Sequence, residues 1–170
     1  MKRLTLMRHG DARWKDPGVS DIERPLSRRG ALAAETVARR LLELELVPDL
    51  LVASPARRTQ QTAEIVAREL ALPSRRVVRE ETLYLASAHE LLRQVHDSGP
   101  RIAHLFVVGH NPGLSELMQL LTPPGGNATL ATAAVCSIAF AAASWEAIDA
   151  GAVTAVERAA PPRGLFRLFP

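Results

Sequence analysis

Residues 102–113 of this 170-residue chain read Ile-Ala-His-Leu-Phe-Val-Val-Gly-His-Asn-Pro-Gly, and they say most about the fold. The first seven residues form a nearly continuous apolar run, which is typical of a parallel strand covered by helices on both faces. The Gly-His-Asn-Pro-Gly segment predicts a turn that leads into a helix over 114–121. The stretch therefore indicates a strand and a helix of a layered α/β domain.

Outside this stretch, short apolar runs again alternate with helical segments. The apolar runs predict strands at 4–7, 50–53 and 76–79, followed by two late, antiparallel strands at 135–140 and 153–156. Helices are expected over about 28–46, 55–70 and through Leu91 to Val95, with Ser27, Ser54 and Ser87 as their N-caps. Pro55 would then occupy the first helical position. The alternation predicts an α/β sandwich of three layers, in which helices cover both faces of a mostly parallel central sheet.

Length and composition indicate one domain and exclude several classes of protein. A chain of 170 residues with 47% hydrophobic residues suits a single core, so we treat 1–170 as one domain. Lys2 and Lys15 are the only lysines among the 21 basic residues, so arginine supplies the other 19. A net charge of +3 and 4% aromatic residues argue against a nucleic-acid partner. Arginine suits recognition of phosphate or carboxylate, but a GC-rich genome would produce the same excess.

The sequence predicts a cytoplasmic protein that does not associate with a membrane. The apolar run at the N-terminus ends after four residues, at Arg8, which is too short for the core of a signal peptide. The alanine-rich stretch 128–143 falls short of a membrane span. Cys136 is the lone cysteine, so no disulfide can form within the chain, and we expect it to be a buried small hydrophobe.

Polar side chains follow three of the predicted strands at the point where each strand ends. Arg8 and His9 follow the first strand, Ser54 follows the second, and His110 follows the strand within 102–108. Ligands of open α/β sheets bind beyond the carboxyl ends of the strands. We therefore expect two histidines and an arginine to meet at one edge of the sheet.

The helix after Ser54 is expected to add a second arginine to this edge. Residues 54, 58 and 62 are four apart, so they share one face of the helix. Arg57 is rotated by about 100° from that face. We therefore expect Arg58 to reach the site and Arg57 to be a solvated surface charge.

These residues resemble three motifs of the histidine phosphatase superfamily. Residues 6–12 contain its Arg-His-Gly signature as Arg8-His9-Gly10. Ser54-Pro55-x-x-Arg58-x-x-x-Thr62 resembles its second arginine motif, and residues 108–113 resemble its second histidine motif. The three motifs occur in the family's order, so the resemblance is specific, and it implies a phosphoglycerate-mutase-like fold.

Within the superfamily, the chain is most similar to the SixA-type phosphohistidine phosphatases. The short length, the segment Arg24-Pro25-Leu26-Ser27 and the loop 109–113 favour that branch. The resemblance covers about residues 1–142, and an arginine-rich tail at 157–170 lies outside it.

The resemblance implies that His9 is a nucleophile that takes the phosphoryl group onto a ring nitrogen before water removes it. Arg8 and Arg58 would hold the phosphoryl oxygens and keep His9 unprotonated, and His110, if protonated, would add a third contact. Helix N-termini at Ser54-Pro55 and Asn111-Pro112 would favour an anion, with Asn111 as a weaker phosphate-binding candidate. No metal and no cofactor is expected, and His89, His96 and His104 have no metal-ligand spacing.

Two further roles are assigned more loosely. The acid that protonates the leaving group would be Glu80 or Glu81, after the strand at 76–79, and we favour Glu81. Asp11 is expected to orient neighbours in the pocket, although a solvated loop carboxylate is nearly as consistent with its position. The sequence around Glu80 and Glu81 matches an acid motif only loosely. Such a loose match suits a phosphohistidine substrate, because the P–N bond of phosphohistidine is already labile.

The leading hypothesis is a phosphohistidine protein phosphatase of signal transduction that acts on a phosphorylated histidine-containing protein. The alternatives are a small-molecule phosphomonoesterase with the same chemistry and, less favoured, a non-catalytic phosphate-binding module. The short chain leaves little room for a segment that would cap the site over a small substrate.

Overall fold

The central sheet has six strands in the order β3-β2-β4-β1-β5-β6 in the computed structural model, which describes residues 1–13, 17–124 and 129–162. β1 pairs with β4, and β2 with β4 and β3, all in parallel, whereas β5 and β6 run antiparallel. The predicted mostly parallel sheet with two late antiparallel strands is therefore confirmed. The strands are β1 (Lys2–Arg8), β2 (Leu50–Ala53), β3 (Val77–Arg79), β4 (His104–Gly109), β5 (Val135–Phe140) and β6 (Val153–Ala159).

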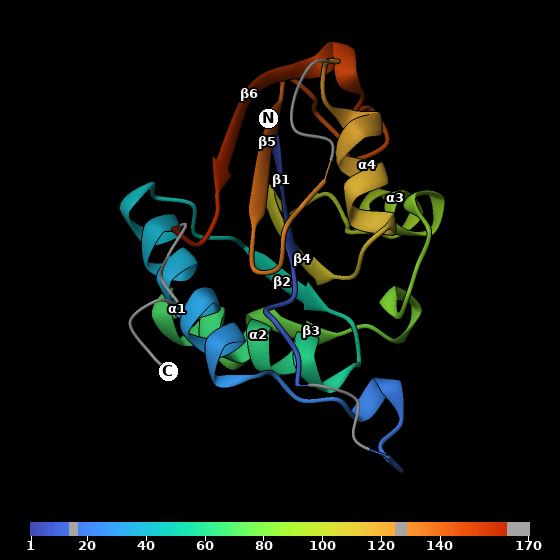
Figure 1. Cartoon of the computed structure of the whole chain (residues 1–170). Helices are drawn as coiled ribbons and strands as arrows, with labels where there is room; N and C mark the ends of the chain where they lie inside the picture. The colour runs from blue at the N-terminus through green and yellow to red at the C-terminus, as the bar shows by residue number, and fades with distance from the viewer. Residues whose placement is uncertain (14–16, 125–128, 163–170) are drawn as a thin grey trace.

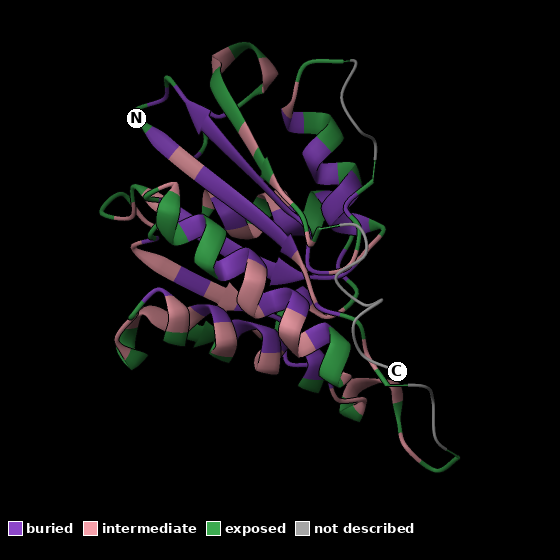
Figure 2. Cartoon of the chain, turned by 60° about the vertical axis from the view of Figure 1, so that its left-hand side comes forward, coloured by how far each residue is buried: buried purple, intermediate pink, exposed green. Residues whose placement is uncertain are grey.

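Four helices cover the two faces of this sheet, which confirms the three-layer prediction (Figure 1). α1 and α2 pack on one face, over a core that includes Met7 and Phe106. α3 and α4 pack on the other face, where Leu6 and Val107 are buried with Cys136. Figure 2 shows the resulting buried layers on the strands and on the inner sides of the helices. The helices are α1 (Arg28–Glu43), α2 (Arg57–Glu69), α3 (Ala88–His96) and α4 (Gly113–Leu121).

Two of the three predicted helix caps are confirmed, and the third is wrong. The side chains of Ser27 and Ser87 accept hydrogen bonds from the backbone at the starts of α1 and α3. Ser54 does not cap α2, whose N-cap is Ala56. The Ser54 hydroxyl is instead 2.7 Å from Nε2 of His110, so a tertiary contact replaces the local one.

The C-terminal boundaries also differ from the sequence prediction. α1 ends at Glu43 rather than near residue 46. Arg158 belongs to the edge strand β6, whereas Arg163 and Arg167 of the predicted tail lie outside the described residues. No helix within the described part of the chain is both long and apolar enough to cross a bilayer.

Gly10 and Gly30 allow the backbone of the β1–α1 loop to lie directly against the backbone at the start of α1. A Cβ atom on Gly30 would stand 2.1 Å from the carbonyl oxygen of Asp11, and one on Gly10 would stand 2.6 Å from the carbonyl oxygen of Gly30. The contacted atoms are backbone, so neither can move aside cheaply. The loop that begins with His9 is therefore held directly against α1.

Replacing Gly30 with alanine is expected to lower the free energy of unfolding by about 2 kcal/mol, because the loop backbone must move away from the new methyl group. Urea denaturation measures this change. Gly109→Ala is the matched control, since the atoms nearest to its Cβ would be those of the Leu114 side chain, at an ordinary 3.5 Å. Equal stability of both variants would show that the loop does not lie this close to α1.

Candidate active site

The parallel strands bring the predicted site residues to one edge of the sheet. Arg8 at the end of β1 is paired with Gly109 at the end of β4, so His9 and His110 leave adjacent strands side by side. Their rings lie 5.3 Å apart between centroids, in an edge-to-face arrangement. Ser54 follows β2, the next strand along, and contacts His110. The predicted meeting of three strand ends is confirmed.

The ring of His9 is held in one tautomer by its own loop. Nδ1 lies 2.7 Å from the carbonyl oxygen of Gly10, and a carbonyl only accepts, so Nδ1 carries the proton. Nε2 is then the unprotonated nitrogen, 3.4 Å from Nε of Arg58. Burial, followed by the charges of Arg58, Arg8 and Arg24, lowers the pKa of His9 to about 4, although the hydrogen bond to Gly10 opposes this. His9 is therefore a neutral imidazole at neutral pH, and its Nε2 lone pair accepts a hydrogen bond from Nε of Arg58.

Arg58 enters the site from the first turn of α2, as its position on the helix face predicts. Its side chain is buried, whereas the neighbouring Arg57 is exposed. Nη2 of Arg58 lies 3.5 Å from Nδ1 of His110, so one guanidinium contacts both histidines. Thr62, one turn further along, accepts a hydrogen bond from the backbone N–H of Gly10. The same helix face therefore holds both the arginine and the His9 loop.

His110 is neutral in this arrangement, so the protonated form that would contact a phosphoryl oxygen is not the resting one. Burial, followed by His9 and Arg58, lowers its pKa to about 3. Its Nδ1 faces a guanidinium donor and its Nε2 faces the Ser54 hydroxyl. Protonation of His110 would thus need a bound anion to offset the surrounding positive charge.

Arg8 supplies a donor that other described residues leave unused. Its Nη1 donates to the carbonyl oxygen of Leu130 at 3.2 Å. Its Nε is buried and has no hydrogen-bond partner among the described residues. A buried donor without a partner costs about 1–3 kcal/mol, and an oxyanion at this position would satisfy it. Burial also lowers the pKa of Arg8.

Asp21 and Tyr84 belong to the cluster, although the sequence reasoning missed both. Asp21 lies in a short 3-10 helix, η1 (Asp21–Glu23), and its Oδ2 accepts from Nη2 of Arg58 at 2.9 Å. The Tyr84 hydroxyl donates to the same oxygen at 2.8 Å, and the Tyr84 ring lies edge-on to His110. Neither residue follows a predicted strand or belongs to a helical pattern, so no signal in the sequence marks them.

The carboxylate of Asp21 stays ionised because cationic and hydroxyl donors surround it. Burial favours its neutral form, but hydrogen bonds from Tyr84, Arg58 and Arg24 outweigh burial and lower the pKa of Asp21 to about 2. Arg58 also donates through Nη1 to the backbone oxygen of Asp21 at 2.6 Å. Asp21 is therefore an anchor for Arg58 and not a protonated acid at neutral pH.

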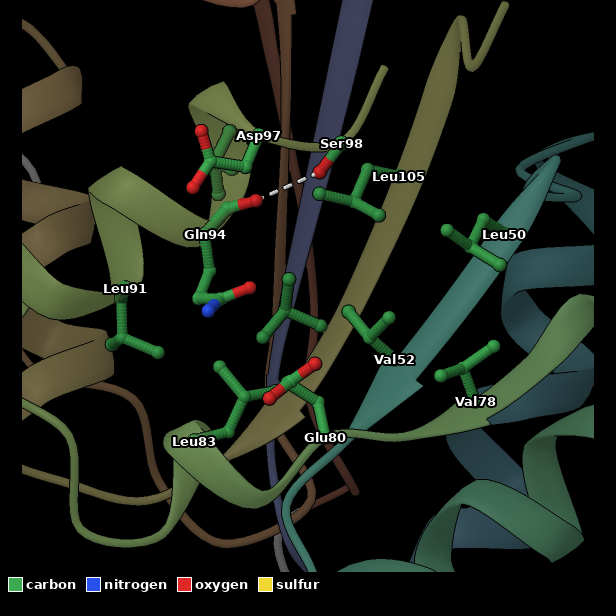
Figure 3. Close-up of a pocket in the computed structure, with 12 residues that line it drawn as sticks. Leu50, Val52, Val78, Glu80, Leu83, Leu91, Gln94, Asp97, Ser98 and Leu105 are labelled. Carbon is green, nitrogen blue, oxygen red and sulfur yellow. Dashed lines mark hydrogen bonds between the residues drawn. The ribbon is translucent and has the colours of Figure 1, made fainter.

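The structure places Glu80 and Glu81 elsewhere, so the predicted acid is not among the contacts of the two site histidines. Glu81 is exposed and accepts from Nε of Arg79 at 2.6 Å. Oε1 of Glu80 accepts from the backbone and hydroxyl of Thr82, because Glu80 is the N-cap of the 3-10 helix η3 (Glu81–Leu83). Figure 3 shows Glu80 at an apolar cleft of about 220 Å³ between α3 and the strands β2 and β4.

Asp11 and Asn111 hold loops together and do not contact the site histidines by hydrogen bonds. Oδ2 of Asp11 accepts from the Ser27 hydroxyl at 2.9 Å, at the start of α1. Asn111 donates through Nδ2 to the carbonyl oxygen of Leu130 and accepts from the Ser115 hydroxyl. The contacts of Asn111 therefore support the segment that Arg8 also contacts.

The titration of the His9 ring tests the electrostatics of the site. By NMR, its protonation midpoint is expected near pH 4 rather than near 6.5, so the neutral form persists as the pH falls to about 4. Arg58→Met should raise the midpoint, because it removes a positive charge that opposes protonation. Arg57→Met, which removes an exposed charge from the same helix, should leave it unchanged. A wild-type midpoint near 6.5 would contradict the buried, arginine-flanked position of His9.

Comparisons with known proteins agree with this geometry. The family model described as "Histidine phosphatase superfamily (branch 1)" matches residues 4–83. The uncharacterized protein MT1313 of Mycobacterium tuberculosis is 30% identical over 120 residues, which span 71% of this chain and 72% of that protein. The uncharacterized chloroplastic protein At3g52155 of Arabidopsis thaliana is 29% identical over 153 residues, or 85% and 69% of the two chains. The match to Pgam5 of Drosophila melanogaster, a mitochondrial serine/threonine-protein phosphatase, is 35% identical over 77 residues and spans 45% of this chain and about a quarter of that one.

Solved structures show the same fold. The proposed phosphohistidine phosphatase SixA of Agrobacterium tumefaciens superimposes with a TM-score of 0.71 at 25% identity, over 81% of this chain and 90% of that one. A mycobacterial glucosyl-3-phosphoglycerate phosphatase, Rv2419c, superimposes with a TM-score of 0.64 at 17% identity, over 94% and 98% of the two chains. Together with the Arg-His-Gly segment and the histidine pair at the sheet edge, these likenesses show that the chain belongs to branch 1 of the histidine phosphatase superfamily and has the form of its SixA-type members.

Proposed function

We propose that this protein is a phosphohistidine protein phosphatase in which His9 carries the phosphoryl group between two steps. The observation that supports this most directly is the tautomer of His9. Its Nδ1 proton is engaged by Gly10, and its Nε2 lone pair lies beside the guanidinium of Arg58. A neutral, oriented imidazole among fixed cations is what attack on a phosphoryl group requires.

The reaction proceeds by two phosphoryl transfers. In the first, Nε2 of His9 bonds to phosphorus as the P–N bond to the substrate imidazole breaks, and that imidazole leaves and takes up a proton. In the second, water attacks phosphorus and the P–Nε2 bond breaks, which releases phosphate and a proton and restores His9. Arg8 and Arg58 hold the phosphoryl oxygens, and the bound dianion favours a protonated His110 that donates to it.

The absence of a protonated carboxylic acid among the contacts of His9 and His110 in the described residues supports a P–N substrate. Asp21 is held ionised, and Glu80 and Glu81 make their contacts elsewhere. An alkoxide leaving group needs strong protonation, whereas an imidazole leaves with less assistance. The positively charged donors also suit an oxyanion better than a metal cation, so we propose that the reaction is metal-independent.

The decisive assay compares a phosphorylated histidine-containing protein with an alkyl phosphate ester, whose alkoxide leaving group needs an acid. The wild-type protein is expected to hydrolyse the phosphohistidine at least tenfold more efficiently, without loss of activity in EDTA, and His9→Ala should be inactive. An alkaline detergent quench during turnover should trap phosphate that is stable to base and labile to acid on wild-type protein, and none on His9→Ala. Faster hydrolysis of the ester would favour a small-molecule phosphomonoesterase, and phosphate binding without hydrolysis would favour a binding module.

Replacing the two adjacent arginines of α2 one at a time tests whether Arg58, and not Arg57, binds the phosphoryl group. With free phosphohistidine as substrate, Arg58→Ala is expected to lower kcat/KM by about 100-fold or more, because a preorganised donor to the transferring group is lost. Arg57→Ala should stay within about twofold, since its exposed side chain lies on another helix face. The reverse order of effects would overturn the assignment of Arg58.

Glu81→Gln tests whether the acid predicted from sequence takes part. The kcat for free phosphohistidine is expected to remain within about twofold of wild type, because the Glu81 carboxylate is an exposed partner of Arg79 and surface ion pairs contribute little. Steady-state kinetics at pH 7 measure this, with Thr82→Ala as the control for the local loop. A large loss in Glu81→Gln alone would restore Glu81 as the acid.

A further inference from the structure

A groove lined by arginines lies beside the cluster of His9, Arg58 and His110. It has a volume of about 430 Å³, and its charged lining residues are Arg13, Arg24, Arg57 and Glu23. Three positive charges against one negative charge make it an anion-attracting surface. We call Arg13, Arg24 and Arg57 the arginine groove.

The carboxylate of Asp21 connects this groove to the catalytic cluster. Oδ1 of Asp21 accepts from Nη1 of Arg24 at 3.1 Å, while Oδ2 accepts from Arg58. The charge of Arg24 is also one of those that lower the pKa of His9. A phosphorylated residue at His9 would therefore have the arginine groove within reach of its flanking side chains.

The side chains of the groove are arranged to receive an anion. Arg24 is fixed, because its Nε and Nη2 donate to the backbone oxygen of Arg13 at 3.3 and 2.9 Å. Arg13 and Arg57 are exposed, and their guanidinium groups form no ion pair with any residue that the structure describes. The groove therefore contains one preorganised cation and two cations that remain open to solvent.

The groove adjoins a second hollow whose charged lining is mainly basic. This hollow has a volume of about 300 Å³, shares Arg13, and adds Arg28, the acid Glu64 and Arg68, whose charge is paired with Glu69 at 3.1 Å. A surface made of two adjoining hollows exceeds what the leaving group of a small phosphate compound would cover. Its extent suits the acidic surface of another protein.

We propose that the arginine groove docks acidic side chains that flank the phosphorylated residue of a protein substrate. This inference rests on the proposed function and specifies the class of substrate for the same site. Charges at the rim of an interface change the association rate and its salt dependence more than they change the chemistry. The groove should therefore lower KM for an acidic phosphoprotein and leave kcat, and the hydrolysis of free phosphohistidine, unaffected.

The test reverses the two exposed charges in an Arg13→Glu/Arg57→Glu variant. The matched control is Arg75→Glu/Arg101→Glu, which makes the same charge change at exposed positions preceding β3 and β4, at the opposite ends of the strands. With an acidic phosphohistidine-bearing protein, the groove variant is expected to raise KM about tenfold with kcat within about twofold, and to weaken the dependence of KM on NaCl. Both variants should hydrolyse free phosphohistidine like wild type.

Several outcomes would overturn the docking role. One is a KM for the acidic protein that rises equally in the control variant. Another is an equal loss on free phosphohistidine, which would make the groove part of the phosphate site. A third is a groove variant with a raised KM for a small bisphosphate and an unchanged KM for the acidic protein. That result would make the groove a subsite for a small polyanion. Matching circular dichroism spectra and melting midpoints establish that both variants fold.

A binding measurement separates this inference from the proposed function. Fluorescence anisotropy can follow the acidic, unphosphorylated protein as it binds to His9→Ala, with and without the groove substitutions. Weaker binding in the groove variant alone supports docking whether or not the wild-type protein hydrolyses phosphohistidine. Unchanged binding overturns docking, and a wild-type protein inactive on phosphohistidine overturns the proposed function alone.

Discussion

The backbone of Gly10 is the constraint on which the candidate site depends. Its carbonyl oxygen accepts from Nδ1 of His9, and its N–H donates to the Thr62 hydroxyl on α2. On the other side, the backbone of Gly30 in α1 leaves no room for a Cβ on Gly10. Two helices of the same layer, α1 and α2, therefore hold the backbone of Gly10 in place. That backbone fixes which nitrogen of His9 faces Arg58. A loop free of these contacts would leave both tautomers accessible.

Both histidines at the sheet edge are neutral, and two arginines lie beside them. Arg8 and Arg58 lie near two imidazoles whose pKa values are lowered, chiefly by burial, to about 4 and about 3. Asp21, whose carboxylate is hydrogen-bonded to Arg58, stays ionised and shares its two oxygens between Arg58 and Arg24. The site thus combines two neutral imidazoles with fixed cations, and a bound phosphoryl group would be a suitable counter-ion.

The carboxylate of Asp21 also joins the candidate active site to the arginine groove. Because Asp21 contacts Arg58 on one side and Arg24 on the other, the arginine groove adjoins the candidate site at this carboxylate. The apolar cleft beside Glu80 is lined instead by side chains such as Leu83 and Val107, with no arginine among them (Figure 3). An acidic substrate would accordingly approach over the β1–α1 loop and the start of α2, and not over α3.

The sequence alone determined the layers of the fold and four members of the site. Strand ends in a parallel sheet meet at one edge, so Arg8, His9 and His110 could be placed together, and the helical repeat selected Arg58 over Arg57. These inferences depend on local periodicity, which a sequence displays directly.

Only the tertiary structure decided the remaining contacts, because they join segments that show no pattern. Asp21 and Tyr84 are 63 positions apart in short irregular segments, yet the Tyr84 hydroxyl donates directly to Oδ2 of Asp21. Ser54 had the local signature of a helix cap, yet its hydroxyl contacts His110 across the strand ends. Glu80 and Glu81 follow the right strand, but local contacts with Thr82 and Arg79 engage their carboxylates. A side chain of this kind takes whichever partner the packed chain brings nearest, and that choice is made in three dimensions.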